Sequence, residues 1–289
     1  MLDIDANRQA VAPRDAATLV LVRDAAGGGV EIFCVERSKQ SKFMGGAIVF
    51  PGGKLDDADR DPRWRECANA PRSPGSPIAP DDETLRALAI AACRETLEEA
   101  ALLPLEGAPL DHETLLAMRA SLAKKETTMI ELVRACGLRL DLAALHAFAR
   151  WVTPTVESRR FDARFFLAVV DAGARGLHDA TETTSSFWAK PADVIARFGA
   201  GEIQLAPPTH RTLEIFSAHR SVADSIAYAA SACLDPICPR LVQHVDAKGP
   251  TMALVLPGDR EHDVATARVP GKSRFVMRGD RWLPEDAPA

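Results

Sequence analysis

The chain has 289 residues, 47% of them hydrophobic and 26% charged, and a formal net charge of −5 at pH 7. This composition is typical of a globular protein, and the mild charge argues against nucleic acid or a membrane surface as a partner. No segment has the length and apolar character of a membrane span, and the N-terminus does not resemble a signal peptide. The six cysteines show no Cys-x-x-Cys pair, so free thiols and a cytoplasmic location are expected.

The chain begins with a polar segment followed by strands. Residues 1–15 predict a flexible N-terminal arm. Segments 16–23 and 30–37 have strand composition and flank a glycine-rich turn, which predicts a hairpin. A short apolar strand at 47–50 leads into Pro51-Gly52-Gly53, where glycines let backbone N–H groups come close to a ligand.

A loop and a long helix come next. Residues 68–80 are rich in proline and small polar residues, which predicts a surface loop. The run from Leu85 to Leu103 predicts one helix that is apolar on most of its surface and therefore largely buried. Either Asp81 or Asp82 would cap its N-terminus.

This helix carries Glu95, Glu98 and Glu99, whose i, i+3, i+4 spacing places the three carboxylates on one face. Like charges so placed repel, and beside a buried surface they are unfavourable unless something positive neutralises them. Arg94 supplies one positive charge, and a divalent cation such as Mg²⁺ or Mn²⁺ would supply the rest. Taken alone, however, the pattern is also common on ordinary solvated helix faces.

The second half of the chain predicts more helices and strands. Helices are expected at 111–123, 127–136, 141–149, 191–198 and 209–232. Strands are expected at 159–170, 183–189, 251–256 and 273–278. Mixed strands and helices, with a glycine turn before the acidic helix, predict an α/β or α+β sandwich with the sheet in the middle and helices outside.

The glycine turn and the acidic helix together resemble the Nudix box. That motif is a glycine, five residues, an acid, seven residues, Arg-Glu, an apolar residue, any residue, Glu-Glu, any residue, glycine and an apolar residue. Here five residues separate Gly53 from the acid Asp59, and Arg94-Glu95 and Glu98-Glu99 have the required spacing.

Three departures from the motif are evident. Between Asp59 and Arg94 lie 34 residues rather than seven, an insertion of 27 that enters on the loop side, where added length costs little. Thr96 stands for the aliphatic residue and Asp59 for the usual glutamate. Ala101 replaces the glycine that would let the helix end with a positive φ.

Further segments are similar to one branch of this superfamily. Arg37-Ser38, Lys42, Gly46 and Phe50-Pro51-Gly52-Gly53 resemble the motif that precedes the box in coenzyme A diphosphatases. The interrupted box and the Arg-Arg-Phe-Asp-x-Arg-Phe-Phe run at 159–166 resemble the peroxisomal acyl-CoA diphosphatases. The resemblance implies a Nudix α/β/α sandwich with a mixed central sheet over residues 16–208, with its insertion at about 60–83. Residues 209–289 are expected to form a helical and β-rich extension packed on the same domain.

The resemblance also implies an activity: metal-dependent hydrolysis of the diphosphate bond of coenzyme A or acyl-CoA, giving 3′,5′-ADP and 4′-phosphopantetheine or its acyl ester. Glu95, Glu98 and Glu99 would hold Mg²⁺ or Mn²⁺, and Arg94 would position a carboxylate. The candidate substrate-binding residues are Arg37, Lys42, Gly52, Gly53, Arg159 and Arg160. A homodimer is consistent with this interpretation.

Several alternatives stay open at this point. The substrate could be ADP-ribose, NADH or another nucleoside diphosphate derivative, or the domain could sense a nucleotide without catalysis. Arg159 and Arg160 precede a strand, so alternation would turn one of them away from the cleft. The general base could be a glutamate of the box or a later acid, for which Glu182 is the candidate. Trp151 and Trp188 could stack on adenine or pack in the core.

Overall fold

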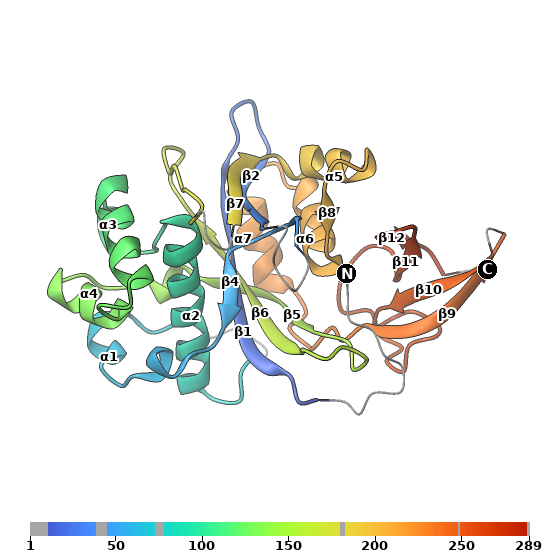
Figure 1. Ribbon diagram of the computed structural model, residues 1–289, viewed down its shortest axis with the longest axis horizontal. Coiled ribbons are helices and arrows are strands. Elements are labelled where there is room, and N and C mark those ends of the chain that lie inside the picture. The colour runs from blue at the N-terminus through green and yellow to red at the C-terminus, as the bar shows by residue number, and fades with distance from the viewer. Residues whose placement is uncertain (1–10, 39–44, 73–77, 180–182, 248, 288–289) are drawn as a thin grey trace.

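The computed structural model describes residues 11–38, 45–72, 78–179, 183–247 and 249–287. A mixed sheet lies in the middle, with helices on both faces and a smaller sheet to one side (Figure 1). The predicted sandwich is confirmed. Among the described residues, no helix combines the length and apolarity needed to cross a bilayer.

The central sheet has eight strands. They are β1 (Arg14–Asp24), β2 (Val30–Arg37), β3 (Ala47–Val49), β4 (Gly52–Lys54), β5 (His146–Val152), β6 (Phe161–Val169), β7 (Thr183–Ala189) and β8 (Gln204–Leu205). Their order is β5-β6-β1-β2-β3-β8, while β4 pairs with β1 and β7 with β2. The pairs β1–β6 and β3–β8 are parallel and the others antiparallel, which makes the sheet mixed.

Strand β1 shows why its sequence is a continuous apolar run. Leu19 and Leu21 pack into the apolar cluster on one face of the sheet, and Val20 and Val22 pack into the cluster on the other face. A strand covered on both faces needs apolar side chains at every position rather than at alternate ones. Long-range pairing with β2, β4 and β6 then holds β1 at the centre of the domain.

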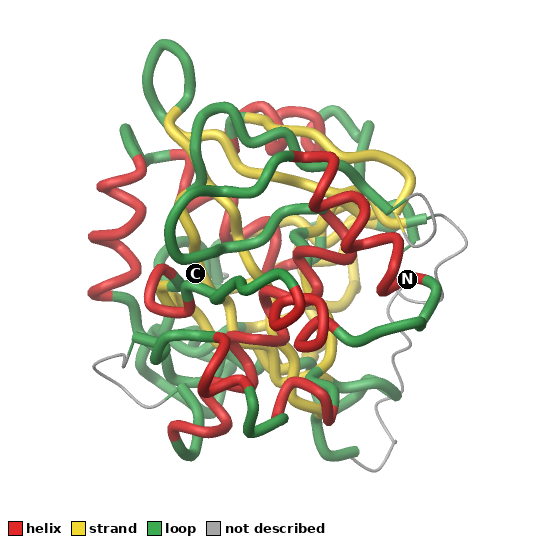
Figure 2. Tube along the Cα trace, turned by 90° about the vertical axis from the view of Figure 1, so that its left-hand side faces the viewer, coloured by secondary structure: helices red, strands yellow, loops and turns green. Residues whose placement is uncertain are grey.

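Helices cover both faces of this sheet (Figures 1 and 2). On one face lie α1 (Trp64–Cys67), α2 (Asp82–Ala100), α3 (His112–Ala123) and α4 (Met129–Ala135). On the other lie α5 (Pro191–Gly199), α6 (Pro207–Ser217) and α7 (Val222–Ser231). Short 3₁₀ helices occupy Asp57–Arg60 and Leu142–Ala144.

The acidic helix α2 begins where the sequence predicted, since the Asp81 side chain accepts a hydrogen bond from the Thr84 amide at 2.7 Å. It ends at Ala100, three residues before the predicted end, and Ala101 takes the left-handed conformation with φ 50°. This is the conformation for which the Nudix motif uses glycine, so the alanine retains the geometry at a cost of about 1 kcal/mol.

Two helix predictions were wrong. Residues 141–149 form a 3₁₀ turn followed by β5, because antiparallel pairing with β6 overrides the local helical pattern. The long helix at 209–232 is divided into α6 and α7. The division lies before Ser221, whose extended backbone and side-chain hydrogen bond with the Asp224 amide start a new helix.

The C-terminal region forms a separate antiparallel sheet. Its strands are β9 (Arg240–Asp246), β10 (Gly249–Val255), β11 (Arg274–Arg278) and β12 (Arg281–Glu285). The strands expected at 251–256 and 273–278 are confirmed as β10 and β11, whereas β9 and β12 were not predicted. Leu254, Phe275 and Trp282 belong to the same apolar cluster as Leu213 of α6. The proposed boundary after residue 208 stays a prediction.

Candidate active site

The acids of α2 and the glycines of β4 lie on the wall of one cleft. Glu95, Glu98 and Glu99 border it together with Gly52 and Gly53, and its volume is about 1080 Å³. Strand β4 is only three residues long, but its pairing with β1 fixes it beside the C-terminal half of α2. Segments 40 residues apart in sequence therefore meet as the motif implies.

Both glycines are required by close packing rather than by unusual dihedral angles. A Cβ at Gly53 would collide with the Glu95 carboxylate, and one at Gly52 would lie 2.7 Å from the carbonyl oxygen of Ala17. The Gly52 amide donates a hydrogen bond to Oε2 of Glu99 at 3.1 Å. The backbone of β4 thus approaches the acidic face closely enough to hold one of its carboxylates directly.

Arg94 organises the acids. Its Nε and Nη2 donate to the two oxygens of Asp59, each at 2.9 Å, and Nη1 donates to Glu95 at 2.7 Å. Asp59 is 2% exposed, and its Oδ2 also accepts from the Asp56 amide. Asp59 therefore faces Arg94 rather than the cleft, and the short 3₁₀ helix before the insertion holds it there.

The glutamates carry more negative charge than Arg94 offsets. Burial raises the pKa of Glu98 to about 7, although the positive charge of Arg94 opposes the shift. Burial likewise raises the pKa of Glu95. A divalent cation would favour the ionised forms, and an all-oxygen donor set suits hard ions of this kind. The donor chemistry of the three residues therefore suits a divalent cation, and Arg94 holds Glu95 in place.

Basic side chains surround the rest of the cleft. They are Arg14, Arg37, Lys54, Arg94, Lys125, Arg159 and Arg160. Arg37 was expected, and its buried Nε has no hydrogen-bond partner within the described part of the chain. Lys42, its expected companion, lies outside the described residues. The sequence analysis did not predict Arg14, Lys54 or Lys125 as cleft residues. Of these, only Lys54 is adjacent in sequence to a residue of the motif, Gly53.

Arg159 and Arg160 both border the cleft, so the expected alternation does not apply, because β6 begins after them at Phe161. Their surroundings differ. Arg160 is buried and donates to the backbone carbonyls of Thr153 and Val11. Arg159 is exposed. The geometry therefore makes Arg159 the one available to a ligand.

The remaining candidates from the sequence are Glu182, Trp188 and Trp151. Glu182 lies outside the described residues. Trp188 packs edge-on against Phe33 with the Arg23 guanidinium 4.3 Å from its ring, which is core packing. Trp151 borders the cleft.

The cleft is also lined by apolar side chains. Trp151 and Phe165 come from β5 and β6, Pro207 begins α6, and Pro239 and Leu254 come from the C-terminal region. Sequence reasoning missed the last two because residues 209–289 match no motif. No local pattern distinguishes a core leucine from one that also borders a cleft.

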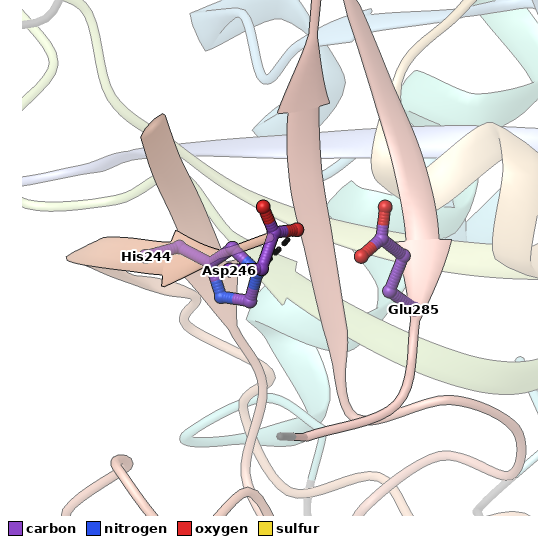
Figure 3. Close-up of side chains that lie close together, drawn as sticks. All are labelled: His244, Asp246 and Glu285. Carbon is purple, nitrogen blue, oxygen red and sulfur yellow. Dashed lines mark ion pairs between the residues drawn. The ribbon is translucent and has the colours of Figure 1, made fainter. Parts of the chain in front are cut away.

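A second acidic cluster lies on the C-terminal sheet (Figure 3). Ligand atoms of His244, Asp246 and Glu285 all lie within 4.8 Å of one another, which those of the three α2 glutamates do not. Arg278 already occupies this cluster, however. Its guanidinium donates to both oxygens of Glu285 at 2.7 Å and also to Asp246. The arginine thus supplies the positive charge that a metal would otherwise provide.

Comparison with known proteins agrees with this geometry. The family model of the NUDT19 Nudix domain matches residues 68–215. The acyl-coenzyme A diphosphatase NUDT19 of Gallus gallus is 30% identical over 324 aligned residues, covering 93% of this chain and 85% of that protein. The Homo sapiens protein of the same name is 27% identical, covering 80% of this chain and 72% of that protein.

A solved structure also superposes well. A Nudix hydrolase from Alicyclobacillus acidocaldarius has a TM-score of 0.64 and 30% identity, covering 75% of this chain and 96% of that one. Together with the split motif and the cleft around Glu95, Glu98 and Glu99, these matches confirm the superfamily and the branch that the sequence indicated. The chain belongs to the NUDT19 family of Nudix hydrolases.

Proposed function

We propose that this hydrolase cleaves the diphosphate bond of coenzyme A and its acyl esters, releasing 3′,5′-ADP and 4′-phosphopantetheine or acyl-phosphopantetheine. The observation that carries the proposal is that one cleft is bordered both by charged residues, called here the charged wall, and by apolar residues of β5, β6 and β10, called here the apolar wall. Acyl-CoA combines the same two kinds of group, phosphates and an apolar chain.

The charged wall suits a substrate with several phosphates. Arg37 and Arg159 reach the cleft from different elements, and a guanidinium binds phosphate oxygens with two parallel hydrogen bonds. We propose these two residues, with Lys42, as phosphate contacts. We also propose Gly52 and Gly53 as substrate-binding residues, because they bring the backbone of β4 to the cleft; the Gly52 amide itself donates to Glu99.

The apolar wall distinguishes this proposal from the alternative substrates. Trp151, Phe165 and Leu254 are each no more than 6% exposed, yet they border the cleft. ADP-ribose and NADH carry polar groups on both sides of the diphosphate, and such a wall would leave those groups without partners. A pantetheine arm with a fatty acyl group would instead bury its methylene groups there.

As a Nudix hydrolase the protein uses a divalent cation, and we propose Mg²⁺ or Mn²⁺ held by Glu95, Glu98 and Glu99. When bound, the cation offsets diphosphate charge and lowers the pKa of the attacking water. Arg94 holds the Glu95 carboxylate at 2.7 Å and is itself held by Asp59. The water oxygen bonds to one phosphorus, and the P–O bond from that phosphorus to the bridging oxygen breaks. The bridging oxygen leaves with the other phosphorus, so each product keeps one phosphate of the diphosphate, and 3′,5′-ADP keeps the 3′-phosphate as well.

We retain Glu182 as the proposed general base for the proton of that water. Replacing Glu182 by glutamine should then lower kcat by about 100-fold or more while KM changes little. If kcat is unchanged, the base is a glutamate of α2. A cytoplasmic location and a homodimer are also proposed. Light scattering of the purified protein measures the oligomeric state.

A substrate panel tests the proposal. Coenzyme A, acyl-CoA esters of increasing chain length, ADP-ribose and NADH are incubated with Mg²⁺ or Mn²⁺, and the products are separated by chromatography. We expect acyl-CoA to have the highest kcat/KM. Replacing Leu254 by alanine should lower this value for long acyl chains about fivefold more than for coenzyme A. Equal loss on both substrates would mean a general folding defect.

The alternatives give different results in the same panel. Turnover of ADP-ribose or NADH without turnover of any CoA species would replace the proposed substrate. Absence of turnover throughout, with retained nucleotide binding, would favour a non-catalytic sensing domain. The retention of Glu95, Glu98 and Glu99 in one cleft argues against this last function.

A further inference from the structure

Lys125 reaches the cleft from a part of the chain that no motif covers. It lies in the turn between α3 and α4, which pack on the same face of the sheet as α2. Its side chain borders the cleft that contains Glu98 and Gly53. The turn therefore adds a positive charge to the lining of the cleft.

The backbone at Lys125 is unusual. Its φ of 57° is left-handed, and Ala101 is the other non-glycine residue with a positive φ in the described part of the chain. The Lys125 amide donates to the carbonyl of Leu122 at 2.8 Å, so the residue follows α3 as a left-handed cap. Glycine or asparagine is usual at such a position, and another side chain there costs about 1 kcal/mol.

The next helix shows what this turn needs structurally. After α4, Gly137 has a φ of 64° and donates its amide to Arg134, while the preceding Cys136 is right-handed. After α3, Lys124 is right-handed and Lys125 left-handed in the same arrangement. The fold accepts glycine at this position in one turn and carries a lysine in the other, at the cleft.

The Lys125 ammonium is also available. It is exposed, and within the described residues it forms no ion pair. An ammonium at the edge of a cleft that receives a polyanion will bind a phosphate oxygen as a point charge. Residues with unfavourable backbone conformations concentrate at binding and catalytic sites.

We propose that Lys125 is a substrate-binding residue that contacts a phosphate group of the nucleotide part of the substrate. The proposal rests on the proposed function for the identity of that substrate. The helical segment between α2 and β5 thus contributes a lysine to the cleft lining and to phosphate recognition.

The variant Lys125→Gly separates binding from structure. Glycine relieves the left-handed backbone and removes the ammonium, so we expect Tm to stay equal or rise while KM for coenzyme A rises about fivefold. We expect kcat to change less than twofold. Lys124→Ala is the matched control, because Lys124 is exposed, adjacent and outside the cleft lining, and it should leave both Tm and KM unchanged.

A purely structural role gives the opposite result. If Lys125 only stabilises the C-terminus of α3 through its charge, Lys125→Gly lowers Tm and leaves KM within twofold of the wild type. That result would overturn the proposal. Comparison of coenzyme A with dephospho-coenzyme A identifies the phosphate: contact with the 3′-phosphate predicts that the KM difference disappears on the second substrate.

Calorimetric binding of 3′,5′-ADP tests Lys125 without turnover. We expect affinity to fall about fivefold in Lys125→Gly and to be unchanged in Lys124→Ala. Equal affinity in wild type and Lys125→Gly, or no binding by the wild type, would overturn the role of Lys125. Weaker binding by the variant together with no hydrolysis of any CoA species would instead reject the proposed activity and retain the phosphate contact.

Discussion

Two clusters in this protein combine acids with an arginine, and their different surroundings decide their chemistry. In the α2 cluster, Arg94 binds Asp59 and Glu95 and also lies 3.5 Å from the carboxylate of Glu98, which borders a cleft. In the cluster on the C-terminal sheet, Arg278 binds Glu285 with two hydrogen bonds and also binds Asp246.

The comparison shows that close spacing of acids is a poor guide to a metal site. In the C-terminal cluster the ligand atoms lie closer together, with His244 Nε2 3.4 Å from Asp246, but both acids are already paired with Arg278. The ion pairs with Glu285 and Asp246 raise the pKa of Arg278. The α2 cluster keeps surplus negative charge beside a cleft, and burial raises the pKa of Glu98 to about 7. A cation is stabilised only by negative charge that the neighbouring arginine has not already offset.

The largest expected effect comes from replacing one acid in each cluster. We expect Glu98→Gln to lower kcat by at least about 100-fold with little change in Tm, because it removes a proposed cation ligand from a partly exposed position. Glu285→Gln should change kcat less than twofold. Steady-state kinetics and thermal unfolding of both variants test this. Loss of activity in Glu285→Gln instead would assign the catalytic cation to the C-terminal sheet.

The next effect concerns the two arginine anchors. Asp59 is buried, so Asp59→Asn should lower the free energy of unfolding by about 3 kcal/mol and kcat by about 10-fold, since Arg94 loses its partner and no longer positions Glu95. Asp246→Asn, in the more exposed pair, should cost under about 1 kcal/mol and leave kcat unchanged. Urea unfolding and steady-state kinetics measure both changes. Similar losses of unfolding free energy and of kcat in the two variants would contradict the distinction between the two clusters.

The smallest effect is the pH dependence of cation binding. With its pKa raised to about 7, Glu98 is mostly protonated at pH 6 and mostly ionised at pH 8. A cation must displace that proton, so the increase in Tm produced by Mn²⁺ should be larger at pH 8.

Matched variants sharpen the pH experiment. In Glu98→Gln, Mn²⁺ should raise Tm only slightly and by the same amount at both pH values. Glu285→Gln should behave as the wild type. If the increase in Tm with Mn²⁺ does not depend on pH in the wild type, the proton on Glu98 does not compete with the cation.

The sequence by itself indicated the acidic face of α2. The spacing of Glu95, Glu98 and Glu99 fixes one helix face, because helical geometry depends only on neighbouring residues. The glycines at 52 and 53 and the apolar run of β1 were also recognisable as patterns in the sequence, although contacts with distant segments explain why the fold needs them. These features were sufficient to predict the sandwich and the Nudix motif, and the structure agrees with both.

Other features depended on tertiary structure. The segment 146–152 has a pattern that also fits a helix, and only pairing with β6 made it a strand. Leu254 and Lys125 border the same cleft although more than a hundred residues separate them. Arg278 pairs with the acids of the cluster on the C-terminal sheet and so distinguishes it from the α2 cluster. Each of these depends on contacts between distant segments, and local sequence patterns carry no information about which distant residues will meet.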